Sequence, residues 1–138
     1  MQIRPYLSFK GECQEAIELY QKAFNIEAPE IMRFGDMPPN PDMEIPESMN
    51  NWVLQATLSF GDNFMRLSDS IGELNDASTE RISIVVEGDL KMVEKAFAVL
   101  EEEGKVKMPL ESTFFSPAYG TLFDKFGVMW SFAATPEE

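Results

Sequence analysis

The sequence predicts an α+β fold built from two βαβββ modules. Segments that alternate polar and apolar residues, as half-buried strands do, surround two segments with the apolar period of an amphipathic helix. The same order of elements occurs twice, in residues 1–69 and 81–138, on either side of a polar linker at 70–80. The modules show no visible sequence identity, so we interpret the repeat as structural and the chain as one structural domain.

The first module combines one helix with four strands. The helix is expected over residues 12–24, where apolar residues recur at helical spacing, and Asn25 is expected to end it in a left-handed conformation. Gly61-Asp62 is typical of a tight hairpin turn between the last two strands. The strands are expected at residues 3–9, 28–34, 52–60 and 63–68.

The second module repeats this order. Its helix is expected to begin after Asp89, whose side chain suits an N-cap, and to end near Gly104. Its strands are expected at residues 81–86, 105–108, 119–123 and 128–132.

Residues 35–51 form a long proline-rich loop in the first module. Loops longer than about 12–15 residues are usually functional or mobile, and this one contains four prolines. It could close over a pocket or reach a partner subunit. Alternatively, it is a surface excursion packed on its own side chains.

Strand periodicity separates an apolar face, which should carry the helices, from a small, hydroxyl-rich face. We expect the sheet to curve, so that the second face becomes a polar cleft; the alternative is a solvated sheet face. The residues on this second face are Tyr6, Ser8, Gln55, Thr57, Arg66, Ser68, Arg81, Ser83, Met129 and Ser131.

Composition excludes several classes of function. The chain has 11 Lys and Arg against 24 Asp and Glu, a net charge of −13, which argues against nucleic acid and anionic membranes as partners. It has no His, which excludes Ser–His and Cys–His nucleophilic pairs and any imidazole metal site. A site for Mg or Ca made of carboxylates alone stays open.

The single cysteine, Cys13, excludes an intramolecular disulfide. Because it lies on the apolar stripe of the first helix, we expect a buried small side chain rather than a nucleophile. We expect no signal peptide, and the sequence has no apolar run of about 20 residues. We therefore expect a cytoplasmic protein that does not span a membrane.

Several motifs, in order along the whole chain, resemble PhnB-like proteins of the vicinal oxygen chelate superfamily, which includes glyoxalase I and bleomycin-resistance proteins. The resemblance implies half-barrel βαβββ modules around a cleft, usually in a homodimer. The motifs are PYLSF at 5–9, AIELY at 16–20, Gly35-Asp36 before the Pro-rich loop, GKVKMPL at 104–110 and GTLFDKFGVMW at 120–130.

The resemblance also identifies four positions that hold metal ligands in metal-dependent members of the superfamily. In this chain they are Tyr6, Arg66, Arg81 and Ser131, in place of His, Glu, His and Glu. Gln55 lies near a position where PhnB-like proteins often have His. We therefore expect no metal and no cofactor, and neither glyoxalase nor dioxygenase activity.

The name demethylubiquinone methyltransferase, which such sequences often carry, implies an S-adenosylmethionine site. No Gly-rich turn follows a strand here, and the doubly wound βαβ pattern is missing. We therefore do not expect methyltransferase activity.

Arg66 and Arg81 are the sharpest candidates for ligand binding, because a guanidinium offers a donor fork that suits carboxylate or phosphate. If both face the cleft, they should converge on an anion. Alternatively, each pairs with a nearby acid such as Glu73 or Glu80.

Further candidates could supply neutral polar contacts or an apolar wall. Ser131, Gln55, Tyr6 and Tyr119 could hydrogen-bond a ligand, although buried tyrosines often satisfy the backbone instead. Phe114 and Phe115 line the cleft rim or pack in the core, whereas Trp52 and Trp130 are expected in the core.

Three classes of function follow. The first is a metal-free protein that binds a small molecule, possibly an anion, and the second is a drug-sequestering protein of the bleomycin-resistance type. The third is a metal-independent enzyme of unknown reaction, for which the sequence supplies no evident general base. The catalytic residues and the identity of the ligand are unknown at this stage.

Overall fold

Four strands and one helix make up the first half of the chain in the computed structural model, which describes residues 1–39, 41–42, 44–72 and 80–136. The helix α1 spans Cys13–Phe24. The strands lie in the spatial order β1-β4-β3-β2, with β1 parallel to β4 and the other neighbours antiparallel. They are β1 (Tyr6–Phe9), β2 (Ile31–Arg33), β3 (Val53–Phe60) and β4 (Asn63–Asp69).

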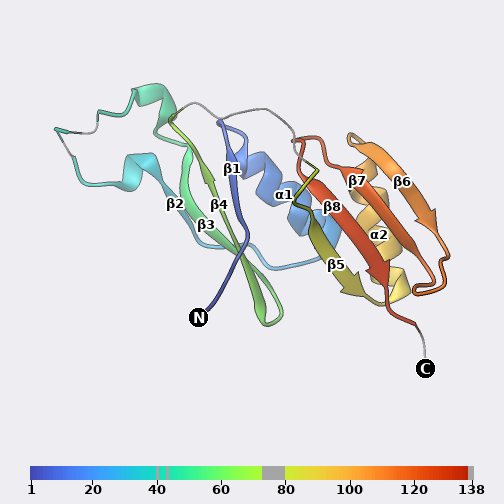
Figure 1. Ribbon diagram of the computed structural model, residues 1–138. Helices are drawn as coiled ribbons and strands as arrows, with labels where there is room; N and C mark the ends of the chain where they lie inside the picture. Colours follow the sequence, from blue (N-terminus) through green and yellow to red (C-terminus); the bar gives the residue numbers. More distant parts are fainter. Residues whose placement is uncertain (40, 43, 73–79, 137–138) are drawn as a thin grey trace. The chain divides into compact units, whose positions relative to one another are not determined.

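The second half repeats this topology (Figure 1). Its strands lie in the order β5-β8-β7-β6, again with one parallel pair, β5 with β8, and antiparallel neighbours elsewhere. The predicted pair of βαβββ modules is confirmed. The elements are β5 (Ile84–Gly88), α2 (Leu90–Glu101), β6 (Lys105–Glu111), β7 (Tyr119–Phe123) and β8 (Met129–Ala134).

The chain divides into two units, each with its own buried centre. The first holds residues 1–21 and 26–75, and the second holds 22–25 and 76–138. Residues 22–25 belong to the second unit because the ring of Phe24 contacts Trp130, at 5.3 Å between ring centroids. The last turn of α1 thus supplies an aromatic side chain to the core of the second unit.

Alternation along the strands sorts the side chains as predicted. In the first unit, the buried residues Ala56, Leu58, Met65 and Leu67 leave the polar residues between them on the opposite face. In the second unit, α2 lies on one face of the sheet (Figure 1). The buried side chains of that face include Leu122, Trp130 and Phe132, with Val93 and Phe97 from α2.

The expected helix ends are confirmed. The Asp89 side chain accepts a hydrogen bond from the backbone N–H of Met92 at 2.9 Å, as an N-cap does. Asn25 has a φ of 51°, the left-handed conformation predicted for the residue after α1.

Several expected strands start or end elsewhere. β1 begins at Tyr6 rather than at residue 3, which fits the missing N–H of Pro5. The expected strand over 28–34 shrinks to Ile31–Arg33, because Phe34 begins a 3₁₀ turn. β6 continues through Pro109 to Glu111, which is possible because β6 is an edge strand.

The loop over 35–51 is closed at its base by backbone hydrogen bonds. Phe34 N–H donates to the carbonyl of Trp52 at 3.0 Å, and Gly35 N–H donates to Asn50 at 2.9 Å. Short 3₁₀ turns lie at each end, Phe34–Asp36 and Glu47–Met49. Whether the loop covers a pocket or meets a partner subunit stays a prediction.

None of the helices in the described residues has the length and apolarity needed to span a membrane.

Candidate functional site

The face of the first sheet opposite its buried residues is polar and carries three of the predicted site residues. Tyr6 pairs with Arg66 across β1 and β4, and Arg66 pairs with Thr57 on β3. These three side chains form one row, because register partners lie on the same face of a sheet. We call this surface the first open face.

A second row lies next to the first on the same face. Ser8 pairs with Ser68, and Gln55, two residues before Thr57 on β3, pairs with Met32. The two rows are joined by a hydrogen bond of 3.1 Å from the Tyr6 hydroxyl to Ser68 Oγ. The structure thus places Tyr6, Gln55 and Arg66 on one face of the first sheet, as the alternation of the strands predicted.

Arg66 is half-buried on this face. Among the residues that the structure describes, its guanidinium makes no hydrogen bond and has no carboxylate within 4.0 Å. A second guanidinium, that of Arg4, lies over the ring of Phe64, 4.7 Å from the ring centroid. Phe64 precedes Arg66 by two residues on β4 and therefore shares its face.

The one carboxylate in these four strands is occupied elsewhere. Asp69 is buried, and its side chain accepts the N–H groups of Gly11 at 2.8 Å, Cys13 at 3.0 Å and Val53 at 2.9 Å. It therefore connects the end of β4 to the start of α1 and to β3. No strand residue of the first open face supplies an acid to Arg66.

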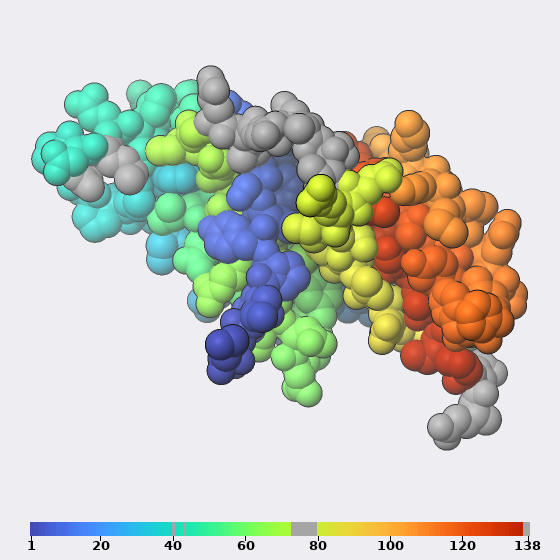
Figure 2. Space-filling view, viewed as in Figure 1, coloured from blue at the N-terminus to red at the C-terminus, as the bar shows by residue number. Residues whose placement is uncertain are grey.

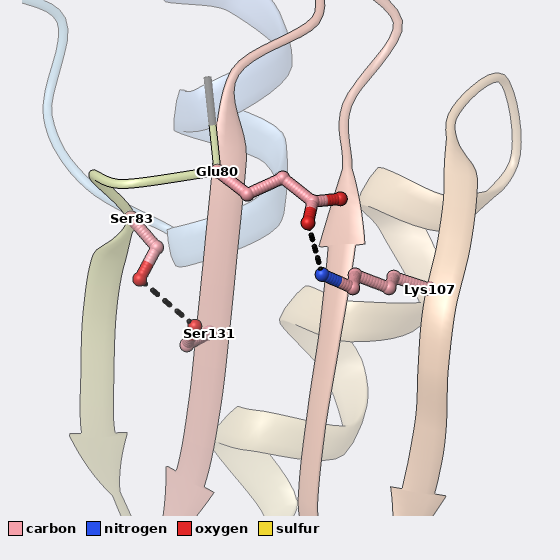
Figure 3. Close-up of polar contacts among 4 residues, drawn as sticks. All are labelled: Glu80, Ser83, Lys107 and Ser131. Carbon is pink, nitrogen blue, oxygen red and sulfur yellow. Dashed lines mark hydrogen bonds and ion pairs between the residues drawn. The ribbon is translucent and has the colours of Figure 1, made fainter. Parts of the chain in front are cut away.

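The second sheet has its own open face, the one opposite α2. Ser131 and Thr121 pair across β8 and β7, and both are almost completely buried, at 5% and 4% exposed. Ser131 Oγ donates to Ser83 Oγ at 3.0 Å (Figure 3). Tyr119 lies two residues before Thr121 on the same face and is half-buried.

Arg81 does not lie where the sequence predicted. The expected strand over 81–86 begins only at Ile84, so Arg81 precedes it, exposed and outside the sheet. The alternative partner Glu80 is paired with Lys107 at 2.6 Å rather than with an arginine, and Glu73 lies outside the described residues. Arg66 and Arg81 belong to different units, and their convergence on one ligand stays a prediction.

The four positions that correspond to metal ligands do not fit a divalent cation. Tyr6 and Ser131 offer hydroxyls, and Arg66 and Arg81 offer guanidinium groups, which stay charged and have no lone pair to donate. Within residues 1–39, 41–42, 44–72 and 80–136, no group of three or more Cys, Asp and Glu side chains could hold a metal ion. Absence of a metal in the working protein stays a prediction.

The aromatic candidates divide between core and surface. Trp130 is buried, as expected, and Trp52 is half-buried. The core alternative for the two phenylalanines is wrong: Phe114 is 100% exposed and Phe115 is 51% exposed, stacked edge-on against Tyr119 at 5.2 Å.

These phenylalanines line a hollow at one end of the second unit. Its volume is about 440 Å³. The wall consists of Leu90, Thr113, Phe114, Phe115, Ser116, Pro117 and Pro136.

Cys13 is completely buried on α1. Burial first, and the nearby charge of Asp69 second, raise the pKa of its thiol to about 12. The thiol therefore stays protonated at neutral pH, which excludes the reactive thiolate of a nucleophile.

Two residues of the second open face were not singled out from the sequence. Thr121 lies in the GTLF segment and Lys107 on β6. The alternation Tyr119, Thr121, Phe123 already indicates the face on which Thr121 lies. No local signal identifies Lys107, because its importance comes from a partner 27 residues away.

Comparison with known proteins identifies the family. Residues 1–133 match the family described as 3-demethylubiquinone-9 3-methyltransferase. Protein YjdN of Escherichia coli K12 is 30% identical over an alignment of 142 positions, which spans 94% of this chain and 92% of YjdN. The chain therefore belongs to this family, and the resemblance to PhnB-like proteins is confirmed.

Solved structures agree with this assignment. PA1353 from Pseudomonas aeruginosa is 30% identical, with a TM-score of 0.83 over 99% of both chains. A PhnB protein from Bacillus cereus is 27% identical, with a TM-score of 0.77 over 98% of this chain and 100% of that one. The fosfomycin resistance protein FosX from Listeria monocytogenes shares only the fold, at 10% identity and a TM-score of 0.62 over 99% and 91%.

Proposed function

We propose that this protein binds a small anionic molecule, without a metal, on the first open face, and that Arg66 is the anion-binding group. The observation that supports the proposal is a half-buried guanidinium with no acidic partner among the described residues. An arginine in this position suits the two oxygens of a carboxylate or phosphate.

The charge of the chain makes this arrangement notable. With 24 acidic residues against 11 basic ones, an arginine has many possible acidic partners. Yet the strands around Arg66 place only hydroxyl, amide, thioether and aromatic groups on its face, and Asp69 is used by backbone N–H groups. Arg4 at the end of the face adds a second positive charge.

Neighbouring hydroxyls can complete the binding of an anion. The Tyr6 and Thr57 side chains flank Arg66 in its row, and Tyr6 already donates a hydrogen bond to Ser68. A hydroxyl that reorients can donate to an oxyanion instead. The same pair of arginines disfavours sequestration of a cationic drug on this face.

The side chains of the first open face favour ligand binding without catalysis. Besides the guanidinium of Arg4 at its end, the first open face carries ionisable protons on Tyr6 and on the guanidinium of Arg66. An arginine does not lose its proton in proteins, and the four strands of the first unit place no carboxylate and no thiol on this face. The methyltransferase activity in the family's description has no support from this face.

The proposal is tested by the melting temperature in phosphate, sulfate or acetate against chloride at equal ionic strength. We expect the oxyanions to raise it more than chloride does, and EDTA to leave this difference unchanged. Arg66→Gln should abolish the difference. Lys10→Gln, which removes an exposed positive charge from the same unit, should preserve it.

Two results would contradict the proposal that Arg66 binds an anion without a metal. If oxyanions raise the melting temperature of Arg66→Gln as much as that of the wild type, the anion binds elsewhere. An effect that disappears in EDTA would show that a metal is needed.

A further inference from the structure

The second open face contains a hydroxyl group that is buried and has no hydrogen-bond partner. Thr121 Oγ1 is completely buried, and no described residue donates to it or accepts from it. Most buried hydroxyls are hydrogen-bonded, because a buried polar group without a partner is costly. Such a group in a folded protein calls for an explanation.

The strands on the two sides of Thr121 place different residues beside it. On β8, Ser131 pairs with Thr121 and hydrogen-bonds to Ser83. On β6, Met108 pairs with Thr121, and the register of the two strands shifts between Val106 and Met108. Lys107 lies at this irregularity, next to the position of Thr121 in the sheet.

Lys107 reaches over the open face to meet a carboxylate. Its Nζ atom lies 2.6 Å from Glu80 Oε2. Figure 3 shows the pair in front of β7, on the side of the sheet away from α2, with Glu80 extending across the sheet toward β6. The Glu80 carboxylate therefore lies on the same face as Ser83, Thr121 and Ser131.

This ion pair is exchangeable. The two side chains are 39% and 54% exposed, and an ion pair between exposed groups contributes little to stability. β6 is an edge strand whose residues are nearly all exposed, and its orange atoms form an outer margin of the second unit in Figure 2. A ligand in solution can therefore reach Lys107.

We propose that the second open face binds the carboxylate or phosphate group of a small ligand at Lys107, and that Glu80 is a built-in competitor for this lysine. The ligand oxyanion displaces Glu80, and the side chains that cover Thr121 then move, so that its hydroxyl donates a further hydrogen bond to the ligand. The site lies entirely in the second unit and does not involve Arg66, so the two proposals can fail separately.

The test is an NMR titration with inorganic phosphate, and separately with acetate, that follows the backbone amides of Thr121 and Ser131. Phosphate and acetate distinguish the two oxyanion classes. Glu80→Gln should raise the affinity about two- to fivefold, the effect of removing a surface ion pair. Lys107→Gln should lower it at least about tenfold.

A matched control and an isosteric variant make the test specific. Lys95→Gln removes an exposed charge from α2, on the other face of the sheet, and should change nothing. Thr121→Val should lower the affinity about two- to tenfold, while the melting temperature of the free protein stays equal or rises. A structural role for the hydroxyl would lower that temperature instead.

Unchanged affinity in Glu80→Gln would overturn the role of Glu80 as a competitor. Unchanged affinity in Lys107→Gln would overturn the site itself. Loss of stability in Thr121→Val without a change in affinity would remove the hydroxyl from the site.

Discussion

Tyr6 and Arg66 are register partners in the parallel pair of β1 and β4, and both lie on the face of the first sheet away from its buried residues. The Tyr6 hydroxyl donates to Ser68 at 3.1 Å, so its position on this face is fixed by a second contact with β4. This face therefore offers a neutral donor, the phenol of Tyr6, and a charged donor, the Arg66 guanidinium, which has no acidic partner among the described residues. This is the arrangement from which anion binding is inferred.

Tyr6→Phe should therefore reduce the oxyanion-dependent rise in melting temperature without abolishing it. The ring remains, and the lost hydrogen bond is exposed, so the free protein should unfold at nearly the same temperature. Thermal unfolding in phosphate and in chloride measures both quantities. Tyr119→Phe, which removes a phenol from the second unit, should leave the effect unchanged; an equal loss in both variants would contradict the assignment.

Asp69→Asn should destabilise the protein by about 2–4 kcal/mol. The carboxylate accepts three backbone N–H groups with two oxygens, and an amide would direct its own N–H₂ at one of them. Chemical denaturation measures the loss. Glu27→Gln, a neutralisation at an exposed position, is the control, and a similar small effect in both variants would show that Asp69 does not join α1 to the sheet.

Cys13 should make the protein less stable in alkali. The pKa of its thiol is about 12 in the folded chain against an ordinary value of 9.0. Above pH 9 the unfolded chain therefore loses this proton while the folded chain keeps it, and the free energy of unfolding falls as the pH rises toward 12.

The comparison of wild type with Cys13→Ala isolates this contribution from the titration of lysines and tyrosines. The variant should lose less stability between pH 9 and 11. A thiol reagent at pH 8 should modify Cys13 only as the protein unfolds. Rapid modification of the folded protein would contradict the burial of this thiol.

Gly104→Ala should destabilise the second unit. A Cβ at this position would lie 2.4 Å from the carbonyl oxygen of Phe123 and 2.6 Å from that of Leu100, both backbone atoms. Gly72→Ala is the matched control, because its Cβ would meet only Ser70 Oγ at 3.8 Å. Equal melting temperatures for the two variants would show that the backbone beside Gly104 moves aside at no cost.

The two helices and the repeated topology follow from local signals in the sequence. The apolar period of α1 and α2 and the caps at Asn25 and Asp89 depend on neighbours within one or two turns. The face on which a strand residue lies also follows from its immediate neighbours, because side chains alternate along a strand. Alternation alone therefore predicts that Tyr6, Gln55 and Arg66 lie on one face.

Strand limits and pairings depend on partners that are distant in the sequence. Polar and apolar residues alternate from the first residue of the segment RISIVV at 81–86, so the pattern does not indicate where the strand begins. Its pairing with β8 begins at Ile84. Arg81 was misplaced for that reason. Lys107 and Glu80 likewise meet only because the sheet brings residues 27 positions apart to one face.

The most direct measurement of the central claim is the side-chain Nε–H resonance of Arg66 in an NMR titration with inorganic phosphate. We predict a saturable shift of this resonance, with Arg33 as the internal reference, because the Arg33 guanidinium is already engaged by Asn51 and Gln14. The shift should saturate at the same phosphate concentration as the rise in melting temperature. A stationary Arg66 resonance while phosphate still stabilises the protein would contradict the account.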